Sequence, residues 1–312
     1  MNRSKQTVEH TIFNQIGNYL TPGDLIVLNN SKTINALLNG WLDGKRRVEV
    51  RLCSSQDAGN KTWQCTVKPA RTPKVGAKIT FENGDLNAAI VGRREDLPYL
   101  WTLEFDFNGD FFSTVNKVGR PIVSPYVSRK WDLNYYQTIH AKVDGSAEMP
   151  AAGRHFTPEL VQSLEKQGIK HCFVTLHTGL SSISVQEEEF EQHKMYDEIY
   201  EVEPRVAELI NQTRKNGGKV LAVGTTVTRT LESVADPEGN MEPRKSRTDL
   251  YIYPGYRWKI IDMLVTNFHG PRTSRIALAA SFTGKELLLR GYEEAIKSRY
   301  RFYEFGDTTL TL

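Results

Sequence analysis

The hydrophobic pattern of the chain changes period along its length, and this change limits the folds that are open to it. Between about residues 48 and 107 the apolar positions alternate in short runs, which turn-forming residues such as Asp57-Ala58-Gly59-Asn60 separate. Short strands at this spacing predict a small antiparallel barrel or sandwich. The runs are VEVRLC, TWQCTVK, KITF, AAIV and LWTLEFDF.

Later parts of the chain alternate strands with helices instead. Thr157 and Pro158 provide an N-cap and a first-turn proline for one helix, and a strand-like run follows at residues 172–176. Another strand at residues 219–223 leads through Gly224 into a further helix. This alternation predicts an α/β core with a mostly parallel sheet.

Together the two patterns predict an α/β fold in which a mostly parallel-sheet core domain carries an inserted small antiparallel β-barrel domain. We expect a discontinuous catalytic core domain made of residues 1–44 and 131–312, with the barrel-like domain at residues 45–130. A chain of 312 residues is long enough for one large domain or two unequal ones.

Composition indicates an ordinary globular protein. The 40 Lys and Arg residues nearly balance the 37 Asp and Glu residues, so the charge neither supports nor excludes an RNA partner. No apolar run approaches the roughly 18 to 20 residues that a membrane helix needs, and no membrane partner is expected. The three cysteines cannot all pair, and a reduced, cytoplasmic compartment is the simplest interpretation.

Common catalytic templates are missing from the sequence. It contains no GxxxxGK[ST] loop, no GxSxG elbow and no GxGxxG motif, which argues against a P-loop nucleotidase, an α/β-hydrolase and a standard dinucleotide site. It also contains no HExxH pair, and the seven histidines are spread from His10 to His269. We therefore expect no metal site.

Polar residues follow several of the predicted strands, where loops often carry ligand sites. His177 comes directly after the strand at residues 172–176, and it is either a general acid or base or a satisfied structural histidine. Thr225 and Thr226 stand between a strand and a helix, so they either hold an anion or simply cap the helix.

The stretch at residues 251–274, YIYPGYRWKIIDMLVTNFHGPRTS, combines a Tyr-Pro-Gly-Tyr turn with a polar cluster. Thr266, Asn267 and His269 form that cluster after an apolar run. A strand that ends in this way often ends at a ligand site, although a tyrosine-rich strand with a turn would show the same letters.

Two further segments carry imidazoles beside charged groups. His193 stands in a run with Asp197 and Glu198, and such a run is usually a solvated face. Arg154 and His155 precede a predicted helix start. Each of these signals is weak alone, and their order along the chain is the stronger evidence.

In that order the segments resemble the S-adenosylmethionine:tRNA ribosyltransferase-isomerases, the QueA family of queuosine biosynthesis. The similarity is co-linear over nearly the whole chain. The matching phrases are DLIVLNNSK, WQCTVKP, YYQTIHA, PAAGRHFTPEL, FVTLHTGL, QHKMYDEIYEV, GGKVLAVGTTVTRTLES, the stretch at residues 251–274, and YRFYEFGD.

The resemblance implies a cytoplasmic transferase that uses S-adenosylmethionine as a co-substrate and no metal. Such enzymes move the ribosyl moiety of S-adenosylmethionine onto the aminomethyl group of 7-aminomethyl-7-deazaguanine in tRNA. The products are epoxyqueuosine in the tRNA, adenine and methionine. The expected partners are therefore S-adenosylmethionine and a tRNA that bears the deazaguanine base.

This chemistry needs acid–base groups, and we assign them by hypothesis to His177, His193 and His269. Thr225 and Thr226 would hold the methionine carboxylate or the ribose hydroxyls. Tyr253 and Tyr256 would stack on a base. The full set of expected substrate-binding residues is Arg154, His155, Thr178, Gly179, Gly224, Thr225, Thr226, Tyr253, Tyr256, Thr266, Asn267 and Arg275.

The chain departs from the family pattern at Arg154 and Arg275, which stand where apolar residues are usual in the family. Guanidinium groups match phosphates and carboxylates, so a different acceptor is an alternative. In that case the chain is a divergent paralogue that uses or cleaves S-adenosylmethionine with a small-molecule acceptor or with none. A second alternative is a non-catalytic RNA- or ligand-binding protein.

Overall fold

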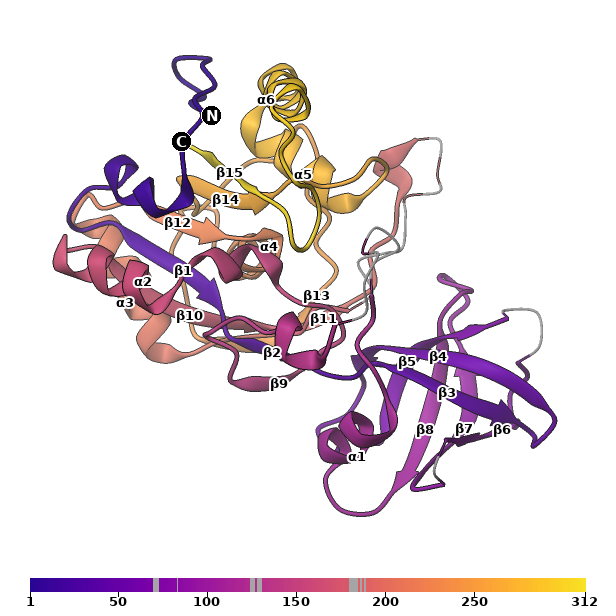
Figure 1. Cartoon of the computed structure of the whole chain (residues 1–312). Helices are drawn as coiled ribbons and strands as arrows, with labels where there is room; N and C mark the ends of the chain where they lie inside the picture. Colours follow the sequence, from indigo (N-terminus) through magenta and orange to yellow (C-terminus); the bar gives the residue numbers. More distant parts are fainter. Residues whose placement is uncertain are drawn as a thin grey trace.

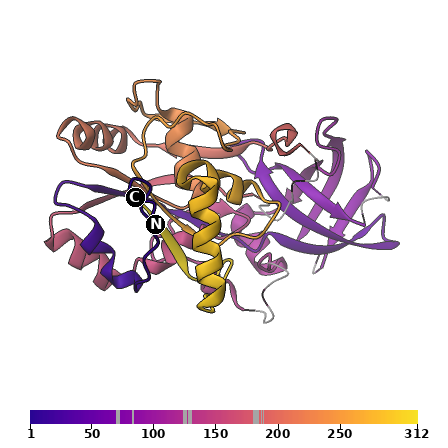
Figure 2. The ribbon, with the colours of Figure 1, turned by 90° about the horizontal axis from the view of Figure 1, so that it is seen from above.

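The computed structural model describes residues 1–69, 73–82, 84–123, 127, 131–179, 185, 187 and 189–312. Two parts are visible in Figure 1, an α/β part that contains both chain termini and a β-barrel set to one side of it. Seen from above, the barrel extends from one end of the α/β part (Figure 2). The termini lie beside each other, and the amino group of Met1 donates a hydrogen bond of 2.7 Å to the Leu310 carbonyl.

A seven-stranded mixed sheet forms the centre of the α/β part. Its four middle strands run parallel, because β1 pairs with both β10 and β12 and β12 pairs with β14. The outer strands β11, β13 and β15 are antiparallel to their neighbours. This confirms the predicted mostly parallel core. In sheet order the strands are β13 (Arg244–Thr248), β11 (Glu198–Val202), β10 (Lys170–Leu176), β1 (Leu25–Asn29), β12 (Val220–Val223), β14 (Met263–Asn267) and β15 (Thr308–Thr311).

The central strands β1, β12 and β14 are covered on both faces of the sheet, which explains why every residue in them is buried. Leu25 and Val27 of β1 belong to a core cluster on one face, and Ile26 and Leu28 to a cluster on the other. Helices α3 (Pro204–Lys215), α4 (Thr225–Val234) and α5 (Ser274–Thr283) contribute to the first cluster. The other helical elements of this part are α2 (Pro158–Lys166), α6 (Lys285–Lys297), η1 (Phe13–Tyr19), η2 (Leu133–Tyr136), η3 (Ala151–His155) and η4 (Phe190–Gln192).

The start of α2 follows the sequence prediction. The Thr157 hydroxyl accepts a hydrogen bond of 3.3 Å from the Leu160 amide, and Pro158 occupies the first helical turn. One of the four amide groups that a helix start leaves unsatisfied is thereby bonded.

Six antiparallel strands close into a barrel, which confirms the predicted antiparallel β unit. Closure depends on β3, which pairs with β4 on one side and with β6 on the other. Trp63 and Phe81 are fully buried in the barrel core, and α1 (Phe111–Val118) packs against that core. The strands are β3 (Leu37–Leu42), β4 (Arg46–Ser55), β5 (Thr62–Lys68), β6 (Lys78–Phe81), β7 (Leu86–Arg93) and β8 (Trp101–Phe107).

The expected domain boundaries differ from the strand pairing at one end. A boundary before residue 45 leaves β3 in the core domain, whereas β3 is an integral barrel strand. No strand was predicted at residues 37–42 from the sequence, and the barrel partner of β3, strand β6, lies far along the chain. The second expected boundary falls between residues 130 and 131. Residues 128–130 are outside the described part of the chain. A small parallel pair joins the two parts, formed by β2 (Ser31–Thr33) and β9 (Val143–Ser146).

Within the described ranges, no helix is long and apolar enough to cross a membrane.

Candidate functional site

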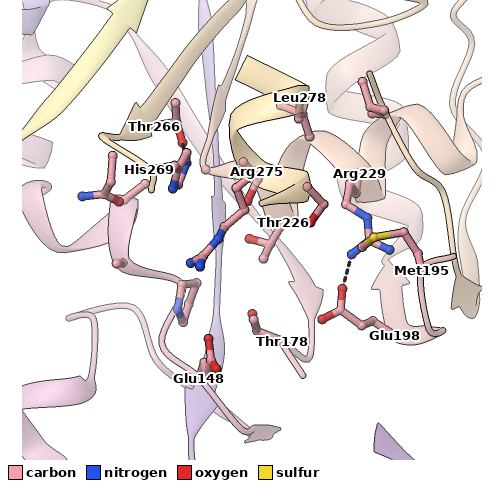
Figure 3. A pocket seen from close by; sticks show the side chains of 18 of the residues that line it. Glu148, Thr178, Met195, Glu198, Thr226, Arg229, Thr266, His269, Arg275 and Leu278 are labelled. Atoms are coloured by element: carbon pink, nitrogen blue, oxygen red, sulfur yellow. Dashed lines mark hydrogen bonds and ion pairs between the residues drawn. The ribbon is translucent and has the colours of Figure 1, made fainter. Parts of the chain in front are cut away.

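A pocket lies where the parallel strands end. Thr178 follows β10, Gly224 follows β12, and Thr266 and Asn267 are the last residues of β14, and all four line the pocket. Ligands in open α/β sheets bind outside the carboxyl ends of the parallel strands, so this is the expected place for a site. The close-up in Figure 3 shows side chains from several loops converging on it.

The turn between β12 and α4 presents a helix start to the pocket. Gly224 precedes α4 with φ of +89°, a backbone conformation that favours glycine. Thr225 and Thr226 form the first turn of α4, and both line the pocket. The Asn29 side-chain amide donates to Thr226 Oγ1 over 3.2 Å and to the Leu176 carbonyl over 2.9 Å. The end of β1 therefore holds this turn against β10.

His269 lies in the wall of the pocket beyond β14. Its Nε2 is 2.7 Å from Thr266 Oγ1, and its backbone amide donates to the Tyr292 hydroxyl over 2.8 Å. Burial, together with the nearby Arg275 guanidinium, lowers the pKa of His269 well below its usual value. The ring is therefore neutral at pH 7 and can accept a proton or share one with Thr266.

Arg275 brings a positive charge to the same region. It stands in the first turn of α5, whose start is capped by the Thr273 hydroxyl, which accepts from the Ile276 amide over 3.3 Å. Figure 3 shows Arg275 and Glu148 extending into the pocket from opposite sides. The starts of α4 and α5 and the Arg275 guanidinium together favour an anionic group in this part of the pocket.

His193 is the second imidazole that lines the pocket. Its Nδ1 lies 3.0 Å from Glu187 Oε2, and its ring packs edge-on against Tyr251 with centroids 5.4 Å apart. If Nδ1 donates to the carboxylate, Nε2 is left as a proton acceptor. A carboxylate in this position also stabilises the imidazolium that forms when the ring takes a proton.

Glu198 and Arg229 form a buried ion pair in the pocket wall (Figure 3). The second Glu198 oxygen accepts a hydrogen bond of 2.6 Å from the Gly179 amide. Arg229 also donates to the Thr248 and Leu250 carbonyls over 3.0 and 2.9 Å. One ion pair thus ties together the segments that follow β10 and β13.

Several buried polar atoms in the pocket have no hydrogen-bond partner within the described residues. They include Thr178 Oγ1 and Asn267 Nδ2, on side chains that are 7% and 4% exposed. A buried polar group without a partner is costly in a folded protein. A ligand that bonds to both would remove that cost.

Nine of the fifteen residues predicted for the site line this pocket. Their positions there leave the chemical role of each one as a prediction. The nine are His193, His269, Thr178, Gly224, Thr225, Thr226, Thr266, Asn267 and Arg275.

The structure places His177 elsewhere, although its neighbour Thr178 lines the pocket. Consecutive residues of an extended segment point in opposite directions, and His177 faces Ser31, whose hydroxyl lies 2.8 Å from His177 Nδ1. It also packs against Gly145, where an added Cβ would lie 2.7 Å from the same nitrogen. Gly179 contributes its amide to Glu198 rather than lining the pocket. For His177 the geometry fits the structural interpretation better than the catalytic one.

Four further predicted residues also lie away from the pocket. The Arg154 guanidinium lies over the Phe305 ring, 4.5 Å from its centroid. His155 packs against Phe13 with ring centroids 5.0 Å apart. The hydroxyl of Tyr256 donates to Glu232 over 3.1 Å, and Tyr253 packs 5.2 Å from the Tyr251 ring. Their letters matched the family phrases, but the turn at residues 251–256 presents different side chains to the pocket.

Several pocket residues were not predicted from the sequence. Arg229 could have been found, because it lies three and four residues after Thr226 and Thr225 on the same helix face. Glu198 was interpreted as part of a solvated face, whereas it is 4% exposed. The other unpredicted lining residues with polar groups are Tyr99, Glu148, Lys194, Tyr196, Tyr251, Ser274, Tyr303 and Glu304.

Across the part of the chain that the structure describes, no three His, Cys, Asp or Glu side chains are grouped as metal ligands.

Comparisons with known proteins identify the family to which the chain is similar. The family model described as queuosine biosynthesis protein matches residues 1–311. An S-adenosylmethionine:tRNA ribosyltransferase-isomerase of Thermoanaerobacter sp. (strain X514) is 43% identical, over 100% of this chain and 91% of that protein. The enzyme of the same name from Thermotoga maritima is 41% identical over the same shares of both chains.

A solved structure extends the similarity to three dimensions. The crystal structure of S-adenosylmethionine tRNA ribosyltransferase from Thermotoga maritima matches with a TM-score of 0.53 and 35% sequence identity. The match covers 100% of this chain and 90% of that one. On these findings the chain belongs to the family of queuosine biosynthesis proteins.

Proposed function

We propose that the protein transfers the ribosyl moiety of S-adenosylmethionine to the aminomethyl group of 7-aminomethyl-7-deazaguanine in tRNA. Epoxyqueuosine forms, and adenine and methionine are released. Family membership and the names of the relatives support this activity. The observation that carries it to this chain is the pocket at the strand ends, where two helix starts, a guanidinium and two imidazoles meet.

The methionine end of S-adenosylmethionine fits the part of the pocket that favours an anion. Its carboxylate would lie between the starts of α4 and α5, within reach of the Arg275 guanidinium. Asn267 Nδ2, a buried donor without a partner in the described residues, would bond to the same carboxylate. Thr178 Oγ1 is available to a ribose hydroxyl.

The reaction begins with removal of a proton beside the sulfonium, where the positive sulfur makes the C–H bond acidic. His193 is the better of the two pocket imidazoles for this step, because Glu187 orients its ring and can stabilise the imidazolium. Ribose opening then expels adenine, and an acid that protonates adenine makes it a better leaving group. His269 is neutral at pH 7, so we expect it and the Thr266 hydroxyl to hydrogen-bond to the leaving adenine and not to be the acid that protonates it.

The acceptor amine next attacks the vinyl sulfonium, and closure of the epoxide releases methionine. Glu148 extends into the pocket opposite Arg275, where its carboxylate would bind the acceptor ammonium and take the proton that the amine must lose before it attacks (Figure 3). A cytoplasmic location is part of the same proposal, since tRNA modification takes place there and Cys53, Cys65 and Cys172 are all free thiols.

A second candidate function has one observation in its favour. Arg275 and Glu148 add opposite charges to the pocket itself, whereas the other unusual arginine, Arg154, lies outside it. A small acceptor that carries its own charges would be recognised by such a pair without the rest of a tRNA. This candidate keeps S-adenosylmethionine as the donor and changes the acceptor.

Chromatographic detection of adenine released from S-adenosylmethionine tests both candidates. Three parallel reactions contain tRNA with the aminomethyl-deazaguanine base, the free base, or no acceptor. Release only with the modified tRNA supports the proposed function. Release with the free base, or without an acceptor, supports the second candidate. If the protein binds S-adenosylmethionine but releases adenine in none of the three reactions, both candidate functions are contradicted. A non-catalytic binding protein then remains.

A further inference from the structure

The barrel contributes one side chain to the pocket. Among the pocket-lining residues in the described ranges, Tyr99 is the one that comes from the barrel. It lies in the loop between β7 and β8, and it is partly buried against the barrel core. The pocket is therefore incomplete without the barrel in its present position.

Hydrogen bonds within the loop hold Tyr99 in place. The Arg94 amide donates to the Leu100 carbonyl over 3.0 Å, and the Leu100 amide donates to the Leu97 carbonyl over 2.9 Å. Arg93 Nε donates to the Pro98 carbonyl over 2.6 Å. Burial raises the pKa of Tyr99 to about 12, so its ring is presented as a neutral phenol. A braced loop of this kind loses little freedom when a ligand contacts its tip.

A shared carboxylate fixes this loop to the α/β part. Asp197 accepts from Arg94 Nη1 over 3.0 Å and from Arg247 Nη1 over 2.5 Å. Arg247 in turn donates to Ser54 Oγ of the barrel strand β4 over 3.1 Å. Asp197 stands between Tyr196 and Glu198, which both line the pocket. The contact between barrel and sheet is thus built into the pocket wall.

We propose that Tyr99 stacks on a flat heteroaromatic base in the pocket and that Asp197 is the positioning residue that holds it there. The inference rests on the proposed function in one respect, because both substrates of that reaction carry such a base. Adenine of S-adenosylmethionine and the deazaguanine of the acceptor share this chemistry. The two tyrosines that the sequence suggested for stacking, Tyr253 and Tyr256, lie outside the pocket, and Tyr99 takes that role.

Direct binding measurements separate the two bases and do not depend on turnover. Calorimetric titration would measure the Kd of S-adenosylmethionine in one series and of free 7-aminomethyl-7-deazaguanine in the other. Stacking of a base on an aromatic ring corresponds to roughly a 5- to 100-fold change in affinity. We expect Tyr99→Leu to weaken one series by about that factor, and Tyr99→Phe, which keeps the ring, to change both by less than about threefold. Tyr135→Leu, at a 50% exposed tyrosine outside the pocket, is the matched control.

The positioning role of Asp197 is tested by a double-mutant cycle. Asp197→Asn should weaken binding in the same series as Tyr99→Leu. The double variant should bind no worse than Tyr99→Leu alone, because both single variants disturb the same interaction. Arg47→Met breaks an exposed barrel ion pair with Glu82 and should change neither Kd. A conservative Asp197→Glu variant that restores binding would separate positioning from a general loss of structure.

Each result decides the proposal. Loss of affinity in one series with Tyr99→Leu but not with Tyr99→Phe supports it, and the affected series identifies the base. Unchanged affinity in both series, or a wild-type protein that binds neither base, overturns it. Failure of the proposed function is a different result, seen as absence of adenine release from a wild-type protein whose binding depends on Tyr99.

Discussion

Glu198 and Arg229 form an ion pair that is almost fully enclosed beside the pocket, with side chains 5% and 9% exposed. The pair is surrounded by further hydrogen bonds, to the Gly179 amide and to the Thr248 and Leu250 carbonyls. A buried charge that keeps all its partners is tolerated, whereas one that loses its partner is not. Stability and pocket shape therefore depend on the same two side chains.

We expect Arg229→Met to lower the free energy of unfolding by about 3 to 5 kcal/mol, because it leaves the Glu198 carboxylate buried without its counter-ion. Urea denaturation at pH 7 would measure the change. The matched control is Glu201→Gln, which breaks the exposed ion pair between Lys245 and Glu201. That pair should contribute about 0 to 1 kcal/mol. Equal losses in the two variants would show that burial of the Glu198–Arg229 pair has no special effect.

His177 should act on stability rather than on catalysis. Burial, helped by the charge of Lys245, lowers the pKa of His177 to about 4 from an ordinary value of 6.5. Between these values the unfolded chain binds the proton and the folded chain does not, so stability is present above pH 6.5 and is lost as the pH falls towards 4. We expect His177→Asn to reduce this acid loss, by at most about 1.4 kcal/mol per pH unit. Urea midpoints between pH 7 and 4.5 would show it.

The same variant tests the catalytic assignment. Because His177 faces Ser31 and Gly145 rather than the pocket, the His177→Asn protein should retain adenine release at pH 7.5. A loss of turnover of about 100-fold or more, the size expected for a missing acid or base, in a protein with wild-type stability would restore His177 as a catalytic residue.

The fold was predictable to the extent that periodicity determines it. Leu25 to Leu28 read as a continuous apolar run because both faces of β1 are covered, and the barrel strands alternate because one face of each meets the barrel core. Strand β3 was assigned to the wrong part because its pairing with β6 joins segments far apart in the sequence. Local patterns carry no information on such closure.

The site was less predictable, and single residues show why. His177 and Thr178 are neighbours in sequence, but the extended backbone turns one towards Ser31 and the other into the pocket. The register that decides between them is a property of the folded sheet. Tyr99 reaches the pocket only because the barrel contacts the α/β part through Arg94 and Asp197. No spacing in the sequence reports a contact of that kind.

His193 should be the more important of the two pocket imidazoles. We expect His193→Gln to lower kcat about 10²- to 10⁴-fold while the Kd of S-adenosylmethionine changes little, because a general base contributes to the reaction and not to ground-state binding. Glu187→Gln should give a smaller loss in kcat, since it removes only the orienting partner.

His171→Gln is the control for that comparison. His171 pairs with Glu165 over 3.3 Å in a similar way, at the start of β10 and away from the pocket. The His171→Gln variant should leave kcat unchanged. Wild-type kcat in His193→Gln would remove His193 as the base and direct attention to His269.

Arg275→Leu separates the two candidate functions. If Arg275 holds the methionine carboxylate, loss of its charge-assisted hydrogen bonds should raise the Kd of S-adenosylmethionine about 10- to 100-fold. Arg257→Leu, at an exposed arginine outside the pocket, is the matched control and should have no effect. Calorimetric titration would measure both variants. If the Kd of S-adenosylmethionine is instead unchanged and the KM of the acceptor rises, Arg275 recognises the acceptor. Such a result would mean that the protein selects an acceptor with an anionic group of its own.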